Sequence, residues 1–207
     1  MDGRHPRAGN CARDTEPGVP ASSSALARVG VVPDHDPGPA DETSPAEVRE
    51  ARFPQDSAVV SRLVAAYLRQ TESEKAEHAL ADERVDGSLP ARYQSEVDDP
   101  AAAFASSTVL LGVADREAVA MVVLSSEAGA ASIARFWVDP AHRGHGVGRR
   151  LLAEALARLP RPVRLSVWDW RTPAIRTYER SGFAVVPSWE SRERLVCMEL
   201  RTDSIER

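Results

Sequence analysis

Apolar residues recur every three or four positions from about residue 59, which predicts a helix that runs to about Arg69. The residues that carry this spacing are Val59, Val60, Leu63, Val64, Tyr67 and Leu68. The run VREARF before them predicts a first strand, and Asp56 is placed to cap the helix. A second, more charged helix is predicted over 72–83. A polar loop over 84–100 follows, with room for one more helical turn between its prolines.

Further along the chain, the pattern changes to the short apolar runs that are typical of β-strands. The runs TVLLGVA, AVAMVVLSS and ASIARFWV lie at 108–114, 118–126 and 131–138. The short polar turns between them predict an antiparallel meander. A helix is predicted to end at Leu159, and a shorter one to begin at Thr172 and end before Gly182. Three more strands are predicted at 163–168, 183–187 and 194–200. This succession predicts one mixed sheet of about seven strands with helices on both faces.

The N-terminal segment differs in composition from the rest. Residues 1–45 hold 7 of the 15 prolines, 5 of the 12 glycines and no Phe, Trp or Tyr. Such a segment buries too little apolar area to offset its ordering entropy, so we expect a disordered tail. A single domain is expected over 46–202, with a short C-terminal tail at 203–207.

The overall charge and the cysteine content narrow the class of protein. A net charge of −5 gives no general attraction to nucleic acid or to an anionic membrane, and no apolar run reaches the length of a membrane span. Cys11 and Cys197 cannot build a disulfide framework, and the first residues lack the apolar stretch of a secretion signal. We therefore expect a cytoplasmic protein. The Arg-rich and Ala-rich composition favours a bacterial source with G+C-rich coding.

The segment RGHGVG, Arg143–Gly148, joins a predicted strand to an amphipathic helix. A helix start presents unpaired N–H groups and a positive dipole end, and glycines let a ligand approach the backbone closely. Together with Arg149, these features predict an anion cradle suited to phosphate. The alternative is a glycine-rich turn that binds nothing. The spacing matches neither a Walker loop nor a dinucleotide fingerprint.

Two motifs resemble the GNAT family of N-acetyltransferases. Arg143-x-x-Gly146-x-Gly148 is similar to that family's loop for the pyrophosphate of acetyl-CoA, and AIRTYERSGF (174–183) is similar to its A-x-x-x-Y-x-x-x-G-F segment. The resemblance covers about residues 47–200. It implies a mixed, mostly antiparallel sheet with a splay between strands 4 and 5, where the cosubstrate enters. It also allows a homodimer.

The resemblance implies site residues one by one. Those implied to contact acetyl-CoA are Trp137, Val138, Arg143, Gly144, His145, Gly146, Val147, Gly148, Arg149 and Arg171. The main chain of Trp137 and Val138 would pair with the pantetheine arm, and the Val138 N–H would stabilise the oxyanion. Tyr178 would protonate the leaving thiolate. A core aromatic beside Phe183 is the structural alternative for Tyr178.

Two departures from the family pattern concern the chemistry of the site. Arg171 stands where the family often has Asn, and it would meet a phosphate instead. The stretch 130–135 lacks the carboxylate that serves many members as general base. The remaining candidates for a base are Glu74, Glu77, His78, Glu127, Asp169 and Glu190, and each is equally compatible with a solvated surface residue. No spacing of ligands predicts a metal site.

The acceptor is expected to meet the segment before the meander. Residues 69–100 hold nine acidic and four basic side chains, which would suit a cationic amine, although a solvated helix face explains them as well. Trp168, Asp169 and Trp170 would line an amine pocket or else pack in the core or a dimer interface. The sequence thus predicts acetyl transfer from acetyl-CoA to an amine. The alternatives are a non-catalytic acyl-CoA-binding domain and a partner-binding protein that acts through its tail.

Overall fold

The computed structural model describes residues 47–81, 88–127 and 130–201. The chain divides into two units, Met1–Ala40 and Asp41–Arg207, and all described residues belong to the second. The predicted tails at 1–45 and 203–207 lie outside the described residues.

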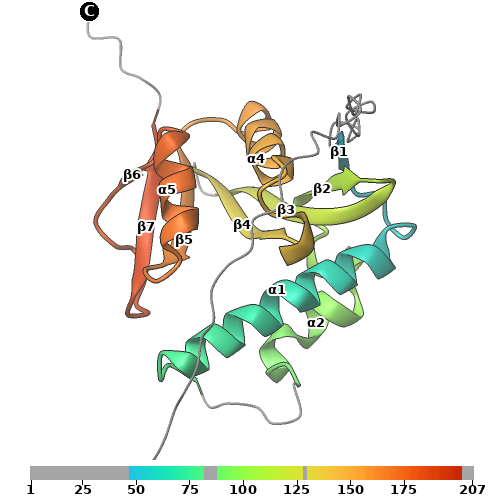
Figure 1. Ribbon diagram of the computed structural model, residues 1–207, viewed down its shortest axis with the longest axis horizontal. Helices are drawn as coiled ribbons and strands as arrows, with labels where there is room; N and C mark the ends of the chain where they lie inside the picture. Colours follow the sequence, from blue (N-terminus) through green and yellow to red (C-terminus); the bar gives the residue numbers. More distant parts are fainter. Residues whose placement is uncertain (1–46, 82–87, 128–129, 202–207) are drawn as a thin grey trace, which may run out of the picture. The chain divides into compact units, whose positions relative to one another are not determined.

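The described residues form one seven-stranded sheet in the order β1-β2-β3-β4-β5-β7-β6 (Figure 1). Its strands are β1 (Glu47–Glu50), β2 (Thr108–Ala114), β3 (Glu117–Glu127), β4 (Ala130–Val138), β5 (Val163–Trp168), β6 (Ala184–Val185) and β7 (Leu195–Leu200). Every neighbouring pair is antiparallel except β4–β5, which is parallel. The mixed, mostly antiparallel sheet predicted from the sequence is therefore confirmed.

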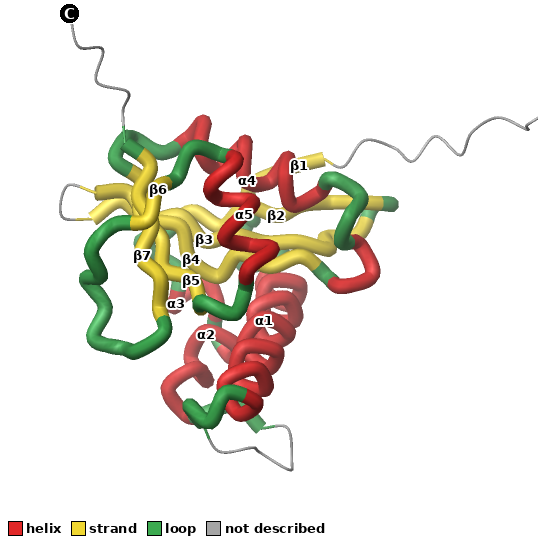
Figure 2. Tube along the Cα trace, turned by 60° about the vertical axis from the view of Figure 1, so that its left-hand side comes forward, coloured by secondary structure: helices red, strands yellow, loops and turns green. Residues whose placement is uncertain are grey.

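Helices cover both faces of the sheet, as predicted (Figure 2). One face carries α4 (Val147–Arg158) and α5 (Thr172–Arg180); the other carries α1 (Ser57–Glu77), α2 (Gln94–Asp98) and α3 (Pro100–Ala103), with a 3₁₀ turn at Ala91–Tyr93. Each face buries its own apolar cluster. The α4 face packs residues such as Leu151, Leu152 and Tyr178. The α1 face packs residues such as Leu63, Met121 and Trp137.

The first helix is longer than the sequence predicted. It continues to Glu77, so the break after Arg69 and the separate helix over 72–83 are wrong. Polar side chains support the extension within the helix itself: Lys75 donates to Glu72 at 2.8 Å, and Gln70 donates to Glu74. Pairs at these spacings stabilise a helix where apolar periodicity fades.

The sheet opens between its two central strands. β4 and β5 pair only at Ala131↔Val163 and Ser132↔Arg164. Beyond that point β4 stays with β3, while β5 stays with β7. The register of β4 against β3 also shifts by one residue near Arg135, whose φ of +50° marks a β-bulge. The predicted splay between strands 4 and 5 is confirmed.

The start of α1 is held by a charged cluster and not by the side-chain cap that the sequence predicted. Asp56 occupies the N-cap position but makes no side-chain cap hydrogen bond. Its carboxylate accepts two bonds from Arg49, at 2.7 and 2.8 Å, and one from the Arg52 N–H at 2.7 Å. The hydrogen bonds from Arg49 outweigh the opposing effect of burial and lower the pKa of Asp56 from 3.8 to about 2.

The lowered pKa predicts how stability depends on pH. Because folding lowers the pKa of Asp56, its contribution is complete above the unfolded value of 3.8 and is lost as pH falls toward 2. We expect Asp56→Asn to lower the free energy of unfolding at neutral pH by about 1–2 kcal/mol and to flatten its acid dependence. Urea unfolding at several pH values measures both effects.

The matched control is Glu154→Gln, which breaks an exposed pair with Arg158 on α4. It should change stability by less than about 0.5 kcal/mol. Equal losses for the two variants would contradict a special role for Asp56.

Candidate functional site

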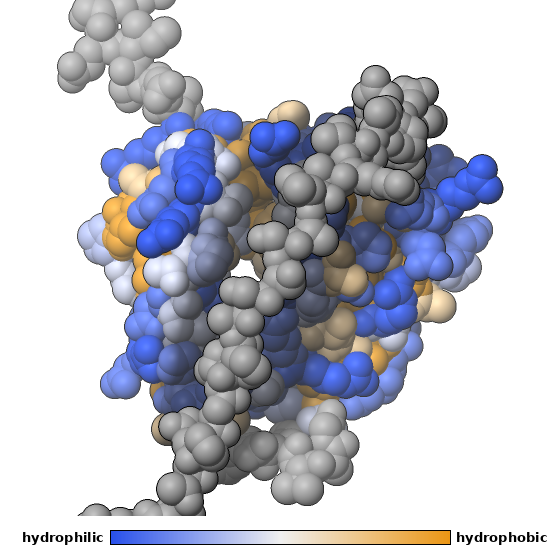
Figure 3. All heavy atoms as spheres, viewed as in Figure 1, coloured by the Kyte–Doolittle hydropathy of each residue, from blue (hydrophilic) through white to orange (hydrophobic). Residues whose placement is uncertain are grey.

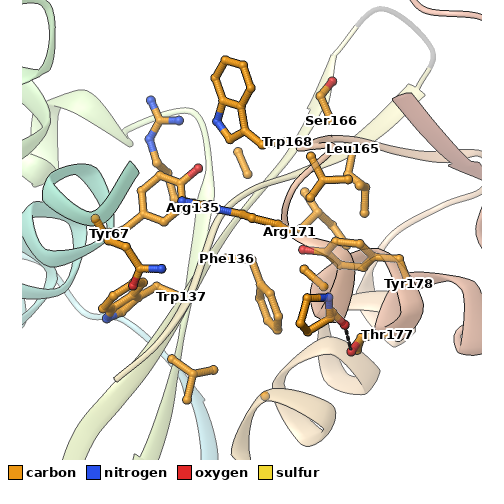
Figure 4. Close-up of a pocket in the computed structure, with 18 of the residues that line it drawn as sticks. Tyr67, Arg135, Phe136, Trp137, Leu165, Ser166, Trp168, Arg171, Thr177 and Tyr178 are labelled. Carbon is orange, nitrogen blue, oxygen red and sulfur yellow. Dashed lines mark hydrogen bonds between the residues drawn. The ribbon is translucent and has the colours of Figure 1, made fainter. Parts of the chain in front are cut away.

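A cleft of ≈ 1450 Å³ opens where β4 and β5 separate. Its walls come from α1, both separating strands, the loop before α4, and α5. Figure 3 shows an opening on this face between the β1–β4 side and the β5–β7 side. Figure 4 shows Tyr67 and Trp137 on one side of this cleft and Tyr178 on the other.

The loop that enters α4 lines this cleft and carries a row of unpaired amides. Within the described part of the chain, no acceptor bonds the backbone N–H groups of Gly144 through Arg149, and the first bond of the series runs from the Arg150 N–H to the Gly146 carbonyl at 3.0 Å. These amides stand at the positive end of the α4 dipole. Anion binding at these amides stays a prediction.

The glycines of the loop leave the space in front of the amides open. Gly144 and Gly146 have φ values of +84° and +83°, and a Cβ built at either position would meet no atom within 4 Å. Gly148 serves packing instead, because a Cβ there would lie 3.1 Å from the Val138 side chain. The open concave backbone, with Arg149 in the lining, fits a pyrophosphate.

The register of β4 decides which main-chain groups face the splay. Trp137 pairs with Met121, and the Asp139 N–H donates to the Val119 carbonyl at 2.8 Å, so the main-chain groups of Trp137 point toward β3. Those of Val138 alternate to the other side, into the splay. Of the two residues expected to pair with a pantetheine arm, only Val138 thus offers backbone groups there.

Arg143 is engaged by the protein itself. Its Nε donates to the Val138 carbonyl at 3.0 Å, its Nη2 donates to Gln70 Oε1 at 2.9 Å, and its guanidinium lies 4.9 Å from the Trp137 ring centre. The Val138 carbonyl is therefore occupied, while its N–H faces the splay. The side chain of Arg143 ties the loop to both β4 and α1.

Tyr178 is packed in the core with its hydroxyl toward the cleft. Its ring contacts Phe136 and Phe183, with centroids 6.2 and 5.8 Å away. Tyr178 lines the cleft, and within the described residues its hydroxyl forms no hydrogen bond. Burial raises the pKa of Tyr178, so the phenol holds its proton at neutral pH. The ring is thus a core aromatic beside Phe183, and proton donation by its hydroxyl stays a prediction.

Arg171 crosses the cleft to α1. Its Nε donates to Glu74 at 2.6 Å and its Nη2 to the Thr71 hydroxyl at 2.8 Å. The carboxylate of Glu74 also accepts from the Trp170 indole at 3.0 Å and from Gln70. The expected phosphate contact of Arg171 stays a prediction, because its guanidinium is bonded to α1 in this structure.

Aromatic rings also pack at the junction where Trp170 and Arg171, on the loop after β5, bond to Glu74 on α1. Trp168 stacks on Trp170 with centroids 4.8 Å apart, and Trp170 stacks on His78 at 4.1 Å. Arg194 lies 5.0 Å from the Trp170 ring centre and pairs with Asp169 at 3.1 Å. The two tryptophans therefore pack with the end of α1, and both also line the cleft.

The candidates for a general base differ in whether they line the cleft. Glu74 and Glu190 line the cleft; Glu77, His78 and Asp169 do not, and the side chain of Glu127 lies outside the described residues. Burial favours the neutral form of Glu74, but hydrogen bonds from Gln70, Trp170 and Arg171 outweigh it and lower its pKa. Glu190 accepts from Ser166 at 2.9 Å and pairs with Arg192 at 2.7 Å. Both carboxylates are thus already bonded.

The structure adds two negative observations for the described ranges. Over 47–81, 88–127 and 130–201, no cluster of three or more His, Cys, Asp or Glu side chains could hold a metal ion. In the same ranges, no helix is long and apolar enough to cross a membrane.

Comparison with known proteins adds a family and a fold. The Acetyltransferase (GNAT) family profile matches residues 62–183. No curated protein sequence matches the chain.

Solved structures share the fold at low identity. The PaiA N-acetyltransferase of Thermoplasma acidophilum, solved with coenzyme A, has a TM-score of 0.59 and 18% identity, covering 76% of this chain and 99% of its own. YncA of Salmonella typhimurium, described as a putative acetyltransferase and solved with acetyl-CoA, has a TM-score of 0.53 and 16% identity. The match covers 79% of this chain and 97% of YncA. The GNAT domain of S. lividans PAT has a TM-score of 0.53 and 23% identity, and the match covers 76% of this chain and 90% of that domain.

Because Glu74 accepts the hydrogen bonds that join α1 to the loop after β5, we expect its substitution to lower stability. Glu74→Gln removes the charge that pairs with Arg171, whose side chain is only 19% exposed. We expect the free energy of unfolding to fall by about 1–3 kcal/mol, as for the loss of hydrogen bonds to a charged group. Thermal and urea unfolding measure it. Arg158→Gln, on an exposed pair, is the control, and an unchanged stability of Glu74→Gln would refute the junction.

Proposed function

Because the chain belongs to the Acetyltransferase (GNAT) family, we propose that it is an N-acetyltransferase that moves an acetyl group from acetyl-CoA to an amine by direct attack. The observation that carries the proposal is the row of unpaired amides from Gly144 to Arg149, facing the cleft that also holds Tyr178. An anion cradle and a protonated phenol around one splay match what a thioester bound through its pyrophosphate needs.

The chain supplies binding and orientation first. The amides of Gly144 through Arg149 and the side chain of Arg149 hold the pyrophosphate of acetyl-CoA, and the main chain of Val138 guides the pantetheine arm into the splay. Acetyl-CoA supplies the activated carbonyl. Fixing the thioester and the amine in one cleft contributes much of the rate, because reaction within the cleft avoids the entropy of a bimolecular encounter.

The transfer then forms a C–N bond and breaks the C–S bond. The neutral amine attacks the thioester carbon, and the Val138 N–H, which faces the splay, donates to the carbonyl oxygen as negative charge develops there. The electron pair of the C–S bond leaves on sulfur, and Tyr178 gives its proton to that thiolate. The proton that the amine sheds passes to water or to a carboxylate of the cleft, with Glu190 and Glu74 as the two glutamates in its lining.

The open space in front of the loop amides predicts how Gly146→Glu changes the binding of acetyl-CoA. Gly146→Glu places a negative side chain in the open space before the amides, so it should abolish saturable acetyl-CoA binding in isothermal titration. The expected loss is about 100-fold or more in affinity, since a like charge replaces an anion site.

Gly146→Ala is the matched control, because it carries the same strain of a positive φ, +83°, without the charge. It should retain measurable binding at a somewhat lower melting temperature. If the wild type fails to bind acetyl-CoA, the acetyltransferase proposal is wrong. If it binds but turns over no amine, the chain is an acyl-CoA-binding domain instead.

We expect loss of the Tyr178 hydroxyl to slow acetyl transfer without weakening the binding of acetyl-CoA. Tyr178→Phe keeps the ring contacts with Phe136 and Phe183 but removes the proton donor. We expect kcat to fall about 100-fold, with little change in stability or in the Kd of acetyl-CoA. The release of free thiol measures kcat with any amine that is turned over.

Tyr93→Phe is the matched control, because the Tyr93 hydroxyl bonds Glu72 at 3.2 Å and Tyr93 does not line the cleft. It should keep full activity. If Tyr178→Phe keeps the kcat of the wild type, Tyr178 is a core aromatic residue and not the proton donor.

A further inference from the structure

The charges on the wall of the cleft indicate which kind of amine this chain accepts. We propose that the acceptor carries a carboxylate besides its amine, and that Arg135 and Arg171 bind this carboxylate beside Tyr67. The proposal rests on the acetyltransferase function proposed above and names the substrate class of that same cleft.

The acidic segment does not provide the negative wall that a cationic amine would need. Among the acidic residues of 69–100 that the structure describes, Glu74 alone lines the cleft, and it is bonded to Arg171. Glu72 is neutralised by Lys75 at 2.8 Å and by Arg92 at 3.1 Å. A polyamine or an aminoglycoside would therefore meet carboxylates that already have partners.

Away from the pyrophosphate loop, the charged lining is mainly cationic. It consists of Arg135, Arg164, Arg171 and Arg192 against Glu74 and Glu190. Arg135 pairs with Glu96 and Arg164 pairs with Glu199, and neither of these two glutamates belongs to the lining. Both pairs thus turn their positive member toward the cleft, which favours an anionic group on the acceptor.

Arg135 is held in place with a donor to spare. The bulge in β4 gives it a φ of +50°. Its Nε and Nη2 donate to the two oxygens of Glu96 at 2.7 and 2.6 Å, and its side chain is 28% exposed. Within the described residues its Nη1 has no partner. A guanidinium fixed by one carboxylate can bind a second one through its remaining N–H groups.

Arg171 approaches the same place from the other side of the splay (Figure 4). Its guanidinium carbon lies 5.5 Å from the centre of the Tyr67 ring, and that of Arg135 lies 5.7 Å from the same centre. Its Nε and Nη2 are used by Glu74 and Thr71, which leaves Nη1. The Nη1 groups of these two guanidiniums are the donors that the proposal assigns to the carboxylate.

The position of this site also suits the reaction. Arg171 is the N-cap residue of α5, and Tyr178 lies two turns further along the same helix. Arg135 lies on the strand that ends at Val138. A short amine anchored by the two arginines would therefore lie in the cleft that Tyr178 and Val138 also line.

The test compares amines that differ only in this anionic group. Free L-amino acids and dipeptides are assayed beside their C-terminal carboxamides, with spermidine and O-phosphoethanolamine as further probes, by thiol release from acetyl-CoA. The carboxylate forms should exceed their carboxamides in kcat/KM by about tenfold or more. An amide lowers the basicity of the neighbouring amine, so protonation of the amine alone would favour the carboxamide.

Substitutions then locate the carboxylate. Arg135→Gln should raise the KM of the carboxylate acceptor about tenfold or more and leave the Kd of acetyl-CoA unchanged, and Arg171→Gln should raise that KM by a similar factor. The double variant Arg135→Gln with Glu96→Gln leaves no unpaired buried carboxylate, and it should show the same rise in KM. Arg158→Gln, on an exposed pair outside the cleft, should behave as the wild type.

The outcomes separate this inference from the proposed function. If acetyl-CoA does not bind, the proposed function fails. If acetyl-CoA binds but carboxamides, spermidine or the phosphorylated amine are preferred, or no carboxylate amine is turned over, the substrate class is overturned. A double variant that restores the KM of the wild type would reduce Arg135 to a structural role.

Discussion

The early separation of β4 from β5 is the constraint on which the rest of this structure depends. A central strand pair normally satisfies its backbone donors and acceptors along its whole length, and unpaired groups inside a protein are costly. Here the ladder has two residue pairs, Ala131↔Val163 and Ser132↔Arg164. The groups beyond them, including the N–H of Val138, face a cleft and are available to a substrate. The two halves of the sheet must then be held together by other means.

Side chains from α1 hold the two halves together. Gln70 accepts from Arg143 on the loop before α4, and Glu74 accepts from Trp170 and Arg171 on the loop after β5. Gln70 and Glu74 are also bonded to each other. One turn of α1 thus connects the loop before α4 to the start of α5. This explains why the helix continues past Arg69, where its apolar periodicity ends.

The same residues mark the limit of what the sequence could predict. Strands with regular apolar runs, such as β2 and β5, were predicted to the residue, because alternation and length suffice to identify them. The splay was predicted from the family resemblance and is confirmed, whereas the pyrophosphate contact of the loop before α4 stays a prediction. The continuation of α1 was missed because its support is polar. The pairing of Glu74 with Arg171 joins residues 97 positions apart, and no local pattern indicates such a contact.

The replacement of the expected Asn by Arg171 links these observations. A short amide at the start of α5 could not reach α1, whereas a guanidinium spans the cleft and bonds both Thr71 and Glu74. That longer side chain brings a positive charge beside Tyr67, where Arg135 already lies. This departure from the family pattern therefore both bridges the splay and adds a positive charge to the wall of the cleft. One residue thus contributes both to the stability of the cleft and to the charge of its wall, which is why this departure from the family pattern bears on the proposed acceptor.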